Sequence, residues 1–383
     1  MTKNFIDYGK CQIIKYGEEL CGDSIDFLQK DNKKVISLCD GLGSGVKGSI
    51  ASTLTSKIGS KMFLYDQSIE EVVKTIINAL PSCKIRGISY STFTFIKIID
   101  DYYFEIINFD NPNIIIKTKF DYKKEEIYIE DYKIDYYRGF LEENDYICAF
   151  SDGVIHAGAK NLMNFSWSLE KIHSFIEKHI KLSCNSICKK VISTSNHIYQ
   201  SKPFDDASFI MLKKKKEQVL NILTGPPLEK TKDEEFVNEF LNKSGYKIIC
   251  GGTSSKIVAR VLNEDIKILN LNSKLPPTYE LKGINLVTEG AITLQKVDDF
   301  LDKYIKGIYD LQDLYMGRSK DEADYKILEY MIEKSSKINI FLGRKTNKAH
   351  ENIIKNIKLR ENIIENISLK LKKIGKKIEI RYF

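Results

Sequence analysis

The chain has 383 residues, of which 59 are basic and 52 acidic, and 43% are hydrophobic. This balance excludes an intrinsically disordered protein, and the length favours two domains over one. No apolar run approaches the ~18–20 residues that span a bilayer, and the N-terminus lacks the apolar core of a signal peptide, so we expect a cytoplasmic protein that does not enter a membrane. The net charge of +7 is spread along the chain and does not favour a nucleic-acid partner.

The first part of the chain, to residue 215, consists mainly of short strand-like segments separated by turn residues. Residues 92–95 and 97–98 alternate between polar and apolar, as half-buried antiparallel strands do. Two stretches, 49–79 and 164–199, instead have apolar residues at helical spacing. Strands interrupted by two helix pairs predict an α+β domain, an antiparallel β-sandwich flanked by helix pairs.

A run of four lysines at 213–216 separates this part from the rest. Such a run is typical of a solvated linker or of a guarded edge strand, and we place the domain boundary there, giving domains 1–215 and 216–383. In the second domain strands alternate with helices, among them a helix at 233–242 and a basic amphipathic helix at 352–377. This alternation predicts a separate α/β domain with a mostly parallel sheet.

The second domain contains one candidate ligand-binding turn, within the segment "CGGTSSKIVAR". Gly251, Gly252, Thr253 and Ser254 come between a predicted strand and a predicted helix, where free backbone N–H groups bind phosphate. The complete phosphate-loop motif is absent, so an ordinary turn with a helix cap stays an equal alternative. We interpret the domain as regulatory or ligand-sensing.

The segment "ISLCDGLGSGVKGSIAS", residues 36–52, places Asp40 at the end of a predicted strand, directly before several glycines. A carboxylate there is held by the sheet and still reaches solvent, and Gly41 allows a sharp turn. An ordinary strand-to-helix turn is one alternative. A dinucleotide-binding fingerprint is another, but the glycine spacing does not fit it.

Acidic residues recur at comparable positions. Asp152 follows an apolar run in "FSDGVIHAG", Asp205 and Asp206 precede a predicted strand in "FDDASFIML", and Asp23 follows a glycine in "CGDSIDF". Hard divalent cations require oxygen ligands on rigid supports. The pattern therefore predicts a metal site built from several strand ends. The eight cysteines show no CxxC spacing, which argues against zinc and indicates reduced thiols.

The order GDS, CDGLGSG, SDG and DDAS resembles the motif series of the metal-dependent protein phosphatases of the 2C class (PPM), in the bacterial branch of the stage II sporulation protein E phosphatase. The resemblance covers about residues 1–213. It implies the family fold, an antiparallel β-sandwich flanked by helix pairs. It also implies a serine/threonine protein phosphatase with two Mn²⁺ or Mg²⁺ ions in each active site, which activate a water molecule for attack on phosphorus.

The resemblance assigns roles to individual residues. Asp40 is similar to the carboxylate that bridges the two ions, and the Gly41 carbonyl to a further ligand of one of them. Asp152 and Asp205 are similar to the ligands of the second ion. Asp23 is similar to the acidic residue that orients metal-bound water, so Asp23 and Asp40 are the expected catalytic residues.

Several assignments stay open. Asp206 ranks below Asp205 as a ligand, and His156 is either a general acid or an ordinary surface histidine. The resemblance implies a phosphoprotein substrate, such as an anti-sigma-factor antagonist; a homodimer is not excluded. One rival function is a catalytically inactive binding or signalling module with the same fold. Another is a phosphatase that acts on a small phosphorylated molecule.

Overall fold

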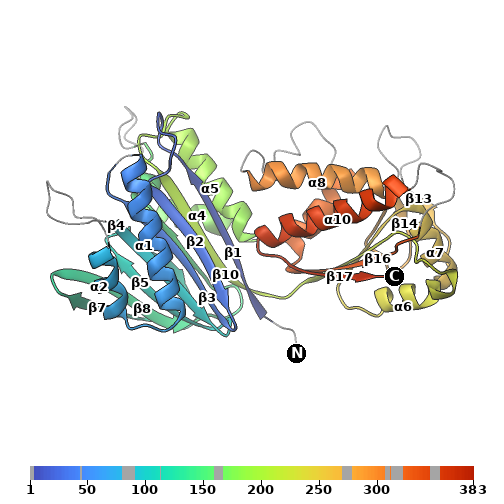
Figure 1. The fold of residues 1–383 in the computed structure, drawn as a ribbon, viewed down its shortest axis with the longest axis horizontal. Helices are drawn as coiled ribbons and strands as arrows, with labels where there is room; N and C mark the ends of the chain where they lie inside the picture. The colour runs from blue at the N-terminus through green and yellow to red at the C-terminus, as the bar shows by residue number, and fades with distance from the viewer. Residues whose placement is uncertain are drawn as a thin grey trace. The chain divides into compact units, whose positions relative to one another are not determined.

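The computed structural model divides into two compact units, Met1–Lys216 and Glu217–Phe383, which run from blue through green and from yellow to red in Figure 1. None of the helices in the described ranges combines the length and apolar character needed to cross a membrane. The cysteines within these ranges are all free thiols. The structure describes residues 4–43, 45–79, 91–112, 114–158, 167–269, 278–306, 311, 322–345 and 354–383.

The first unit contains two antiparallel sheets. The six-stranded sheet has the order β2-β3-β4-β5-β8-β7, and the four-stranded sheet has the order β1-β10-β9-β6. Every strand pair in both sheets is antiparallel. The strands are β1 (Asn4–Ile13), β2 (Asp23–Lys30), β3 (Lys33–Gly41), β4 (Ser91–Ile99), β5 (Tyr103–Phe109), β6 (Ile115–Lys117), β7 (Lys123–Ile129), β8 (Tyr132–Phe140), β9 (Tyr146–Phe150) and β10 (Ala207–Lys216).

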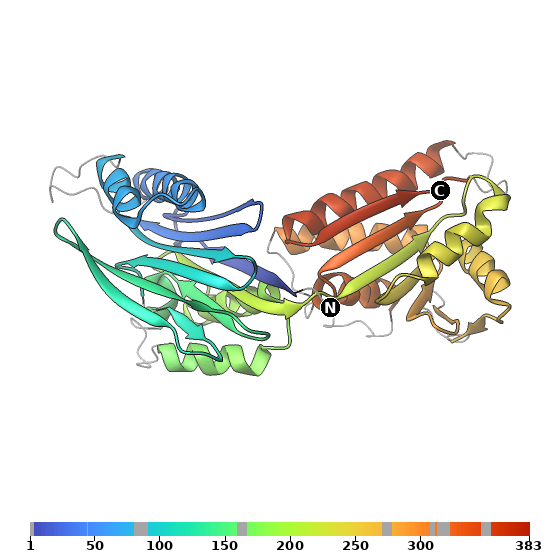
Figure 2. The same cartoon turned by 90° about the horizontal axis from the view of Figure 1, so that it is seen from below.

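Helix pairs cover the outer faces of both sheets, as Figure 2 shows with the blue helices above and a green helix below. The first pair packs on the six-stranded sheet and the second pair on the four-stranded sheet. This architecture confirms the predicted antiparallel β-sandwich flanked by helix pairs. The helices are α1 (Val46–Leu64), α2 (Ile69–Ala79), α4 (Leu169–His179) and α5 (Cys184–Ile198), with a short α3 (Asp152–Ile155) after β9.

Strand β3 shows how the sandwich orients the residues of the candidate site. Val35 and Cys39 lie in the cluster under α1 and α2, whereas Ile36 and Leu38 lie in the core between the two sheets. Because side chains alternate along a strand, Asp40 continues the inward-facing series of Ile36 and Leu38. Burying one such apolar side chain contributes about 1.5–3 kcal/mol, so the register of β3, and with it the direction of Asp40, is strongly specified.

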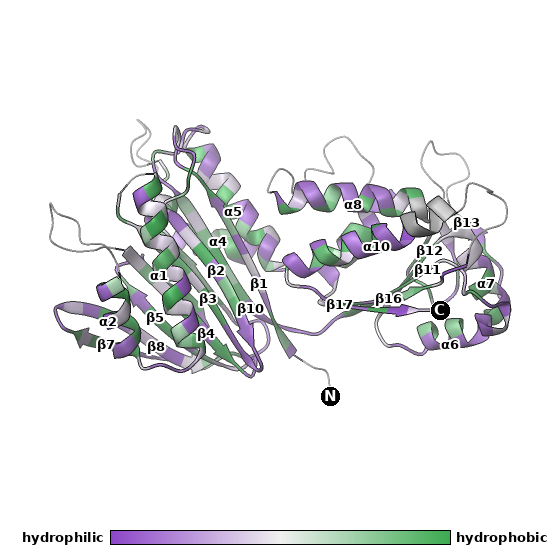
Figure 3. Ribbon diagram, in the orientation of Figure 1, coloured by the Kyte–Doolittle hydropathy of each residue, from purple (hydrophilic) through white to green (hydrophobic). Residues whose placement is uncertain are grey.

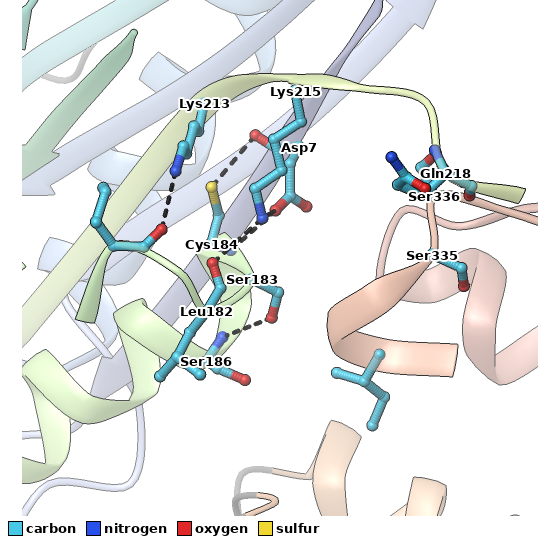
Figure 4. Close-up of polar contacts among 12 residues, drawn as sticks. Asp7, Leu182, Ser183, Cys184, Ser186, Lys213, Lys215, Gln218, Ser335 and Ser336 are labelled. Carbon is cyan, nitrogen blue, oxygen red and sulfur yellow. Dashed lines mark hydrogen bonds and ion pairs between the residues drawn. The ribbon is translucent and has the colours of Figure 1, made fainter. Parts of the chain in front are cut away.

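The lysine run at 213–216 is not a solvated linker, and that interpretation is wrong. It forms the second half of β10 and pairs with β1. Lys213 and Lys214 are each only 4% exposed. The Lys213 ammonium donates to the Ile180 carbonyl at 2.8 Å (Figure 4), and that of Lys214 donates to the Leu141 carbonyl at 2.6 Å. The long side chains cover apolar surface on opposite faces of the sheet while their charged ends reach backbone carbonyls.

The next lysine stabilises the start of α5 through a carboxylate of β1. The Lys215 ammonium pairs with Asp7 at 2.8 Å, and the same Asp7 oxygen accepts a hydrogen bond from the Cys184 backbone N–H at 3.0 Å, as Figure 4 shows. Ser183 caps the helix by accepting from the Ser186 N–H. Asp7 is 9% exposed. A buried carboxylate at a helix N-terminus offsets the positive end of the helix dipole.

We expect Asp7→Ala to lower the free energy of unfolding by about 1–3 kcal/mol, because it leaves the half-buried Lys215 ammonium and the Cys184 N–H without this partner. Urea unfolding of the full chain, followed by circular dichroism, measures the change. Glu143→Ala is the matched control, because Glu143 pairs with Lys216 between two exposed side chains and its loss should cost at most about 0.5 kcal/mol. Equal effects of the two substitutions would contradict the structural role of Asp7.

The second unit contains a seven-stranded sheet with the order β13-β14-β15-β12-β11-β16-β17. The run from β15 to β17 is parallel, and β14 and β13 add antiparallel strands at one edge. The predicted α/β domain with a mostly parallel sheet is therefore confirmed. The strands are β11 (Val219–Thr224), β12 (Tyr246–Cys250), β13 (Lys267–Ile268), β14 (Thr278–Glu280), β15 (Leu286–Thr288), β16 (Lys337–Leu342) and β17 (Lys377–Tyr382).

Helices cover both faces of this sheet. One face packs against α6 and α7, and the other against α8, α9 and α10, which Figure 1 shows below and above the strands. Hydrophilic and hydrophobic residues alternate along α8 and α10 (Figure 3). The helices are α6 (Asp233–Leu241), α7 (Gly252–Leu262), α8 (Ala291–Ile305), α9 (Ala323–Glu329) and α10 (Ile354–Lys373), with shorter turns η1 (Lys230–Lys232) and η3 (Tyr330–Lys334).

The chain order of these strands creates a crevice at one edge of the sheet. From β11 the chain continues to the neighbouring β12, goes on to the far edge at β13 and comes back through β14 to β15. It later adds β16 and then β17 on the other side of β11. The connections thus leave β11 and β16 in opposite directions. In open α/β sheets this reversal leaves a crevice at the carboxyl ends of the strands, where ligands bind.

Candidate functional site

Two aspartates face each other on neighbouring strands of the six-stranded sheet. Asp23 is the first residue of β2, and its register partner in β3 is Asp40. Directly opposed residues on antiparallel strands lie on the same face with Cβ atoms about 4.5–5.5 Å apart. Asp23 is 4% exposed. The hydrophobic interior of the sandwich therefore ends in a pair of largely buried carboxyl groups.

The glycines after Asp40 allow the chain to turn directly into α1. A Cβ atom on Gly41 would lie 2.0 Å from the Gly48 carbonyl oxygen, and one on Gly48 would lie 2.7 Å from that of Gly43. Both contacts are shorter than any side chain tolerates, so the loop packs against the first turn of α1 only because these residues are glycine. Gly41, the expected carbonyl ligand, follows Asp40 directly in the sequence, and this close packing fixes its position against α1.

The other sheet contributes Asp152 and Asp205 to the same end of the sandwich. Asp152 follows β9 and begins α3, and Asp205 precedes β10. The two strands pair with Phe150 opposite Phe209, so the end of β9 meets the start of β10. Asp205 is held by the Asp206 N–H, which donates to its Oδ1 at 3.0 Å. The pairing of β9 with β10 thereby brings together Asp152 and Asp205, which are far apart in the sequence.

Ser151, which the sequence analysis did not identify, connects the two sheets at this end. Its hydroxyl donates to Asp23 Oδ2 at 2.7 Å and accepts from the Ser208 N–H at 2.9 Å. Its own N–H donates to the Ser208 carbonyl at 3.0 Å. Ser151 directly precedes Asp152 in the motif SDG. A serine next to an aspartate was the only signal for it in the sequence.

Asp206 has a different role from its neighbour Asp205. Asp206 Oδ1 accepts from the Lys15 N–H at 2.9 Å, and Oδ2 accepts from the Gly22 N–H at 2.7 Å. Both carboxylate oxygens thus bind the backbone of the segment that leads from β1 into β2. This arrangement makes Asp206 a positioning residue for the segment before Asp23, consistent with its lower rank as a ligand.

Burial and mutual repulsion raise the pKa values of these carboxyl groups. Burial is the largest cause of the raised pKa of Asp40, followed by the negative charges of Asp23, Asp152 and Asp205. Burial also raises the pKa of Asp23, and the charges of Asp206 and Asp152 raise it further although the Ser151 hydroxyl opposes the change. The pKa of Asp205 is raised by burial and then by Asp152. Such a cluster of desolvated like charges is typical of functional sites.

The residues fit a hard divalent cation. Asp23 Oδ1 and Asp152 Oδ1 are buried and accept no hydrogen bond from any described residue. An unsatisfied carboxylate oxygen is costly to bury, and a cation would supply the missing counter-charge. The donors are all oxygens, as Mg²⁺ and Mn²⁺ prefer. In the described ranges no three acidic, histidine or cysteine side chains are grouped as a metal site.

His156 lies one helical turn after Asp152 but makes no hydrogen bond to it. The His156 Nε2 is 3.9 Å from Asp152 Oδ2, and the imidazole is 54% exposed. A more closely integrated group is Tyr199, whose hydroxyl donates to the Gly153 carbonyl at 2.5 Å and holds α3 in place. Tyr199 could not be identified from the sequence, because nothing in the surrounding residues distinguishes it from other aromatic residues of helices.

The remaining candidate residues lie in the second unit. Gly251, Gly252, Thr253 and Ser254 form the turn from β12 into α7 and line a pocket there. They belong to a different compact unit from the aspartates.

Comparison with known protein families gives one match, which lies within the first unit. Residues 30–215 match the family described as Stage II sporulation protein E (SpoIIE). No protein with a curated description matches the sequence significantly.

Solved structures also resemble this chain. The phosphatase domain of the cell fate determinant SpoIIE from Bacillus subtilis is 19% identical, with a TM-score of 0.41, over 56% of this chain and 95% of that one. A SpoIIE structure from the same organism with a fragment of the regulatory domain is 17% identical, with a TM-score of 0.45, over 57% and 65%. The S. agalactiae serine/threonine phosphatase is 15% identical, with a TM-score of 0.40, over 55% and 99%.

Proposed function

We propose that the first unit, in which residues 30–215 match the stage II sporulation protein E family, is a metal-dependent protein phosphatase that hydrolyses phosphoserine and phosphothreonine. The observation that carries this proposal is the cluster of aspartate side chains at one end of the sandwich. Asp40 is half-buried there, and the negative charges of Asp23, Asp152 and Asp205 act on it. Such a group requires positive charge, and a phosphatase needs positive charge to bind and activate a phosphate ester.

The proposal assigns the ligands from the chemistry of the site. Asp40, Asp152, Asp205 and the Gly41 carbonyl would hold Mn²⁺ or Mg²⁺ ions. Bound divalent cations lower the pKa of water and offset the charge of the phosphoryl oxygens. Asp23, fixed through Oδ2 by the Ser151 hydroxyl, keeps Oδ1 free to orient water or hold a proton.

The substrate follows from the resemblance. A phosphoprotein such as an anti-sigma-factor antagonist is the proposed substrate. His156 stays the lower-ranked candidate for the group that protonates the leaving oxygen, because its imidazole is exposed beside Asp152.

Hydrolysis of p-nitrophenyl phosphate and of phosphoserine, phosphothreonine and phosphotyrosine peptides by the full chain tests the proposal. We expect turnover that EDTA abolishes and that added Mn²⁺ or Mg²⁺ restores. Phosphoserine and phosphothreonine peptides should be hydrolysed in preference to phosphotyrosine peptides. Activity that survives EDTA would contradict metal dependence. Bound metal without turnover of any substrate would favour the non-catalytic signalling module, and turnover of small phosphate esters alone would favour the small-molecule phosphatase.

A further inference from the structure

The second unit contains a pocket that the proposed phosphatase reaction does not use. It has a volume of ≈ 420 Å³ and lies at the carboxyl ends of β11, β12 and β15. Its walls include Gly225 after β11, Gly251 and Ser254 between β12 and α7, Gly290 after β15, and Arg360 of α10. Small-molecule sites commonly have volumes of about 300–1,000 Å³ and lie at this edge of open α/β sheets.

The start of α7 faces this pocket. Helix α7 begins at Gly252 after an N-cap glycine, Gly251, and in the described structure it has no side-chain cap. The φ of Gly251 is +136°, a conformation that side-chain-bearing residues rarely adopt, and a Cβ on Gly290 would lie 2.9 Å from the Gly251 Cα. The two glycine turns therefore pack tightly and leave the positive end of an 11-residue helix open. Such an end binds anions.

Ser254 provides a second and independent sign of a ligand. The residue is 1% exposed, and its hydroxyl oxygen has no hydrogen-bond partner among the described residues. The hydroxyl lies in the first turn of α7, 3.2 Å from where a Cβ of Gly251 would stand, and it lines the pocket. Burying an unpaired hydroxyl costs about 1–3 kcal/mol, so this group lacks an acceptor that a bound molecule would supply.

Arg360 supplies the charge. This half-buried arginine forms no ion pair or hydrogen bond with the part of the chain that is described, and burial alone lowers the pKa of its guanidinium. The guanidinium lies over the turn after β11, because a Cβ on Gly225 would be 2.6 Å from its Nη1. By contrast, Arg344 pairs with Glu361 at 2.7 Å. A half-buried guanidinium with no carboxylate partner among the described residues is suited to a bidentate bond with a phosphate group.

The other charged residues that line the pocket restrict the charge that a ligand can carry. Two exposed charged residues, Lys256 and Glu289, also line the pocket, so it holds a second cation and one carboxylate. Glu289 accepts a long hydrogen bond of 3.4 Å from the Tyr279 hydroxyl. A molecule that is anionic throughout would be repelled by Glu289, whereas a hydroxyl group could donate to it.

We propose that this pocket binds an organic phosphate monoester, with its phosphate at the start of α7 between Ser254 and Arg360 and its hydroxylated part towards Glu289. The pocket is far larger than one phosphate ion requires, which favours the ester over inorganic phosphate. The proposal is independent of the phosphatase activity, because all of its residues belong to the second unit.

Isothermal titration calorimetry of the full chain in EDTA tests the proposal, since removal of metals suppresses phosphate binding at the aspartates. The probes are adenosine 5′-monophosphate, ribose 5-phosphate and inorganic phosphate. We expect at least one ester to bind more tightly than inorganic phosphate. Arg360→Gln should weaken its binding at least ~10-fold, and Ser254→Ala about 3- to 10-fold. Arg344→Gln, the matched control, should bind as the parent does.

Several results would overturn the proposal. One is the absence of binding heat from every probe at millimolar concentration, and another is an Arg360→Gln protein with the parent's affinity. Inorganic phosphate binding as tightly as both esters would overturn the assignment of an organic ligand. Circular dichroism verifies the fold of each variant. If Arg360→Gln does not fold, Arg360→Lys and Ser254→Ala carry the test, and unchanged affinity in both contradicts the site.

Discussion

Asp40→Asn is expected to lower metal-dependent phosphatase activity at least ~10³-fold and, at the same time, to raise the melting temperature of the metal-free protein. The activity falls because the site loses the carboxylate expected to bind both ions, and metal stabilisation of the reacting charges contributes several kcal/mol. The stability rises because partial burial and the like charges around Asp40 raise its pKa and so disfavour its ionised form. We expect a gain of about 1–3 kcal/mol at neutral pH.

The pH dependence of this gain follows from the raised pKa of Asp40. An unfolded chain releases the Asp40 proton near pH 4, whereas the folded chain retains it to higher pH. The metal-free parent therefore loses stability as the pH rises from about 4 through the raised pKa. The asparagine variant has no such group, so its advantage should be absent below about pH 4 and should grow towards neutral pH.

Asp31→Asn is the matched control for this prediction. Asp31 is an exposed residue in the turn at the other end of the β2–β3 hairpin, with a φ of +52° that asparagine also adopts. Calorimetric melting of both variants in EDTA between pH 4 and 8, with activity measured in Mn²⁺, provides the comparison. An Asp40→Asn protein that melts like Asp31→Asn at every pH would show that Asp40 is not electrostatically frustrated.

The neighbours Asp205 and Asp206 are expected to respond in opposite ways to the same substitution. Asp205→Asn should lower activity at least ~10²-fold with little loss of stability, because it removes a proposed ligand whose pKa is raised by burial and by Asp152. Asp206→Asn should instead lower the free energy of unfolding by about 1–3 kcal/mol. Its amide NH₂ would oppose one of the two N–H groups, of Lys15 and Gly22, that now donate to the carboxylate.

Urea unfolding in EDTA and phosphatase assays in saturating Mn²⁺ separate the two effects. The decisive comparison is between the two variants, because both replace an aspartate by an asparagine and the two positions are adjacent in the sequence. If Asp206→Asn unfolded like the parent, or if Asp205→Asn kept the parent's activity, the division into ligand and positioning residue would be wrong.

The architecture could be predicted because local patterns and packing agree. Alternating residues predicted antiparallel strands, and the alternation of β3 between its two hydrophobic clusters shows why. In the second unit, helix–strand alternation predicted the parallel sheet. Strand β14, which lies between β13 and β15, was missed, since a segment of three residues (Thr278–Glu280) has too short a pattern to detect.

The features that the sequence did not predict depend on contacts between distant segments. The lysine run at 213–216 has the composition of a linker, and only its carbonyl partners in other elements explain why Lys213 and Lys214 are buried. Ser151 bonds to a carboxylate of the other sheet. Arg360 reaches the turn at Gly225 from a helix far along the chain. No local pattern contains such partners.

The most direct test of the central claim, that acidic residues of both sheets jointly bind catalytic cations, is the number of Mn²⁺ ions bound per chain. Equilibrium dialysis of the full-length parent and of Asp40→Asn, each checked for folding, measures it. We predict about two ions per parent chain and a substantially lower number for the variant. A parent that binds no Mn²⁺ at millimolar concentration, or a variant that binds as many ions as tightly as the parent, would contradict the account.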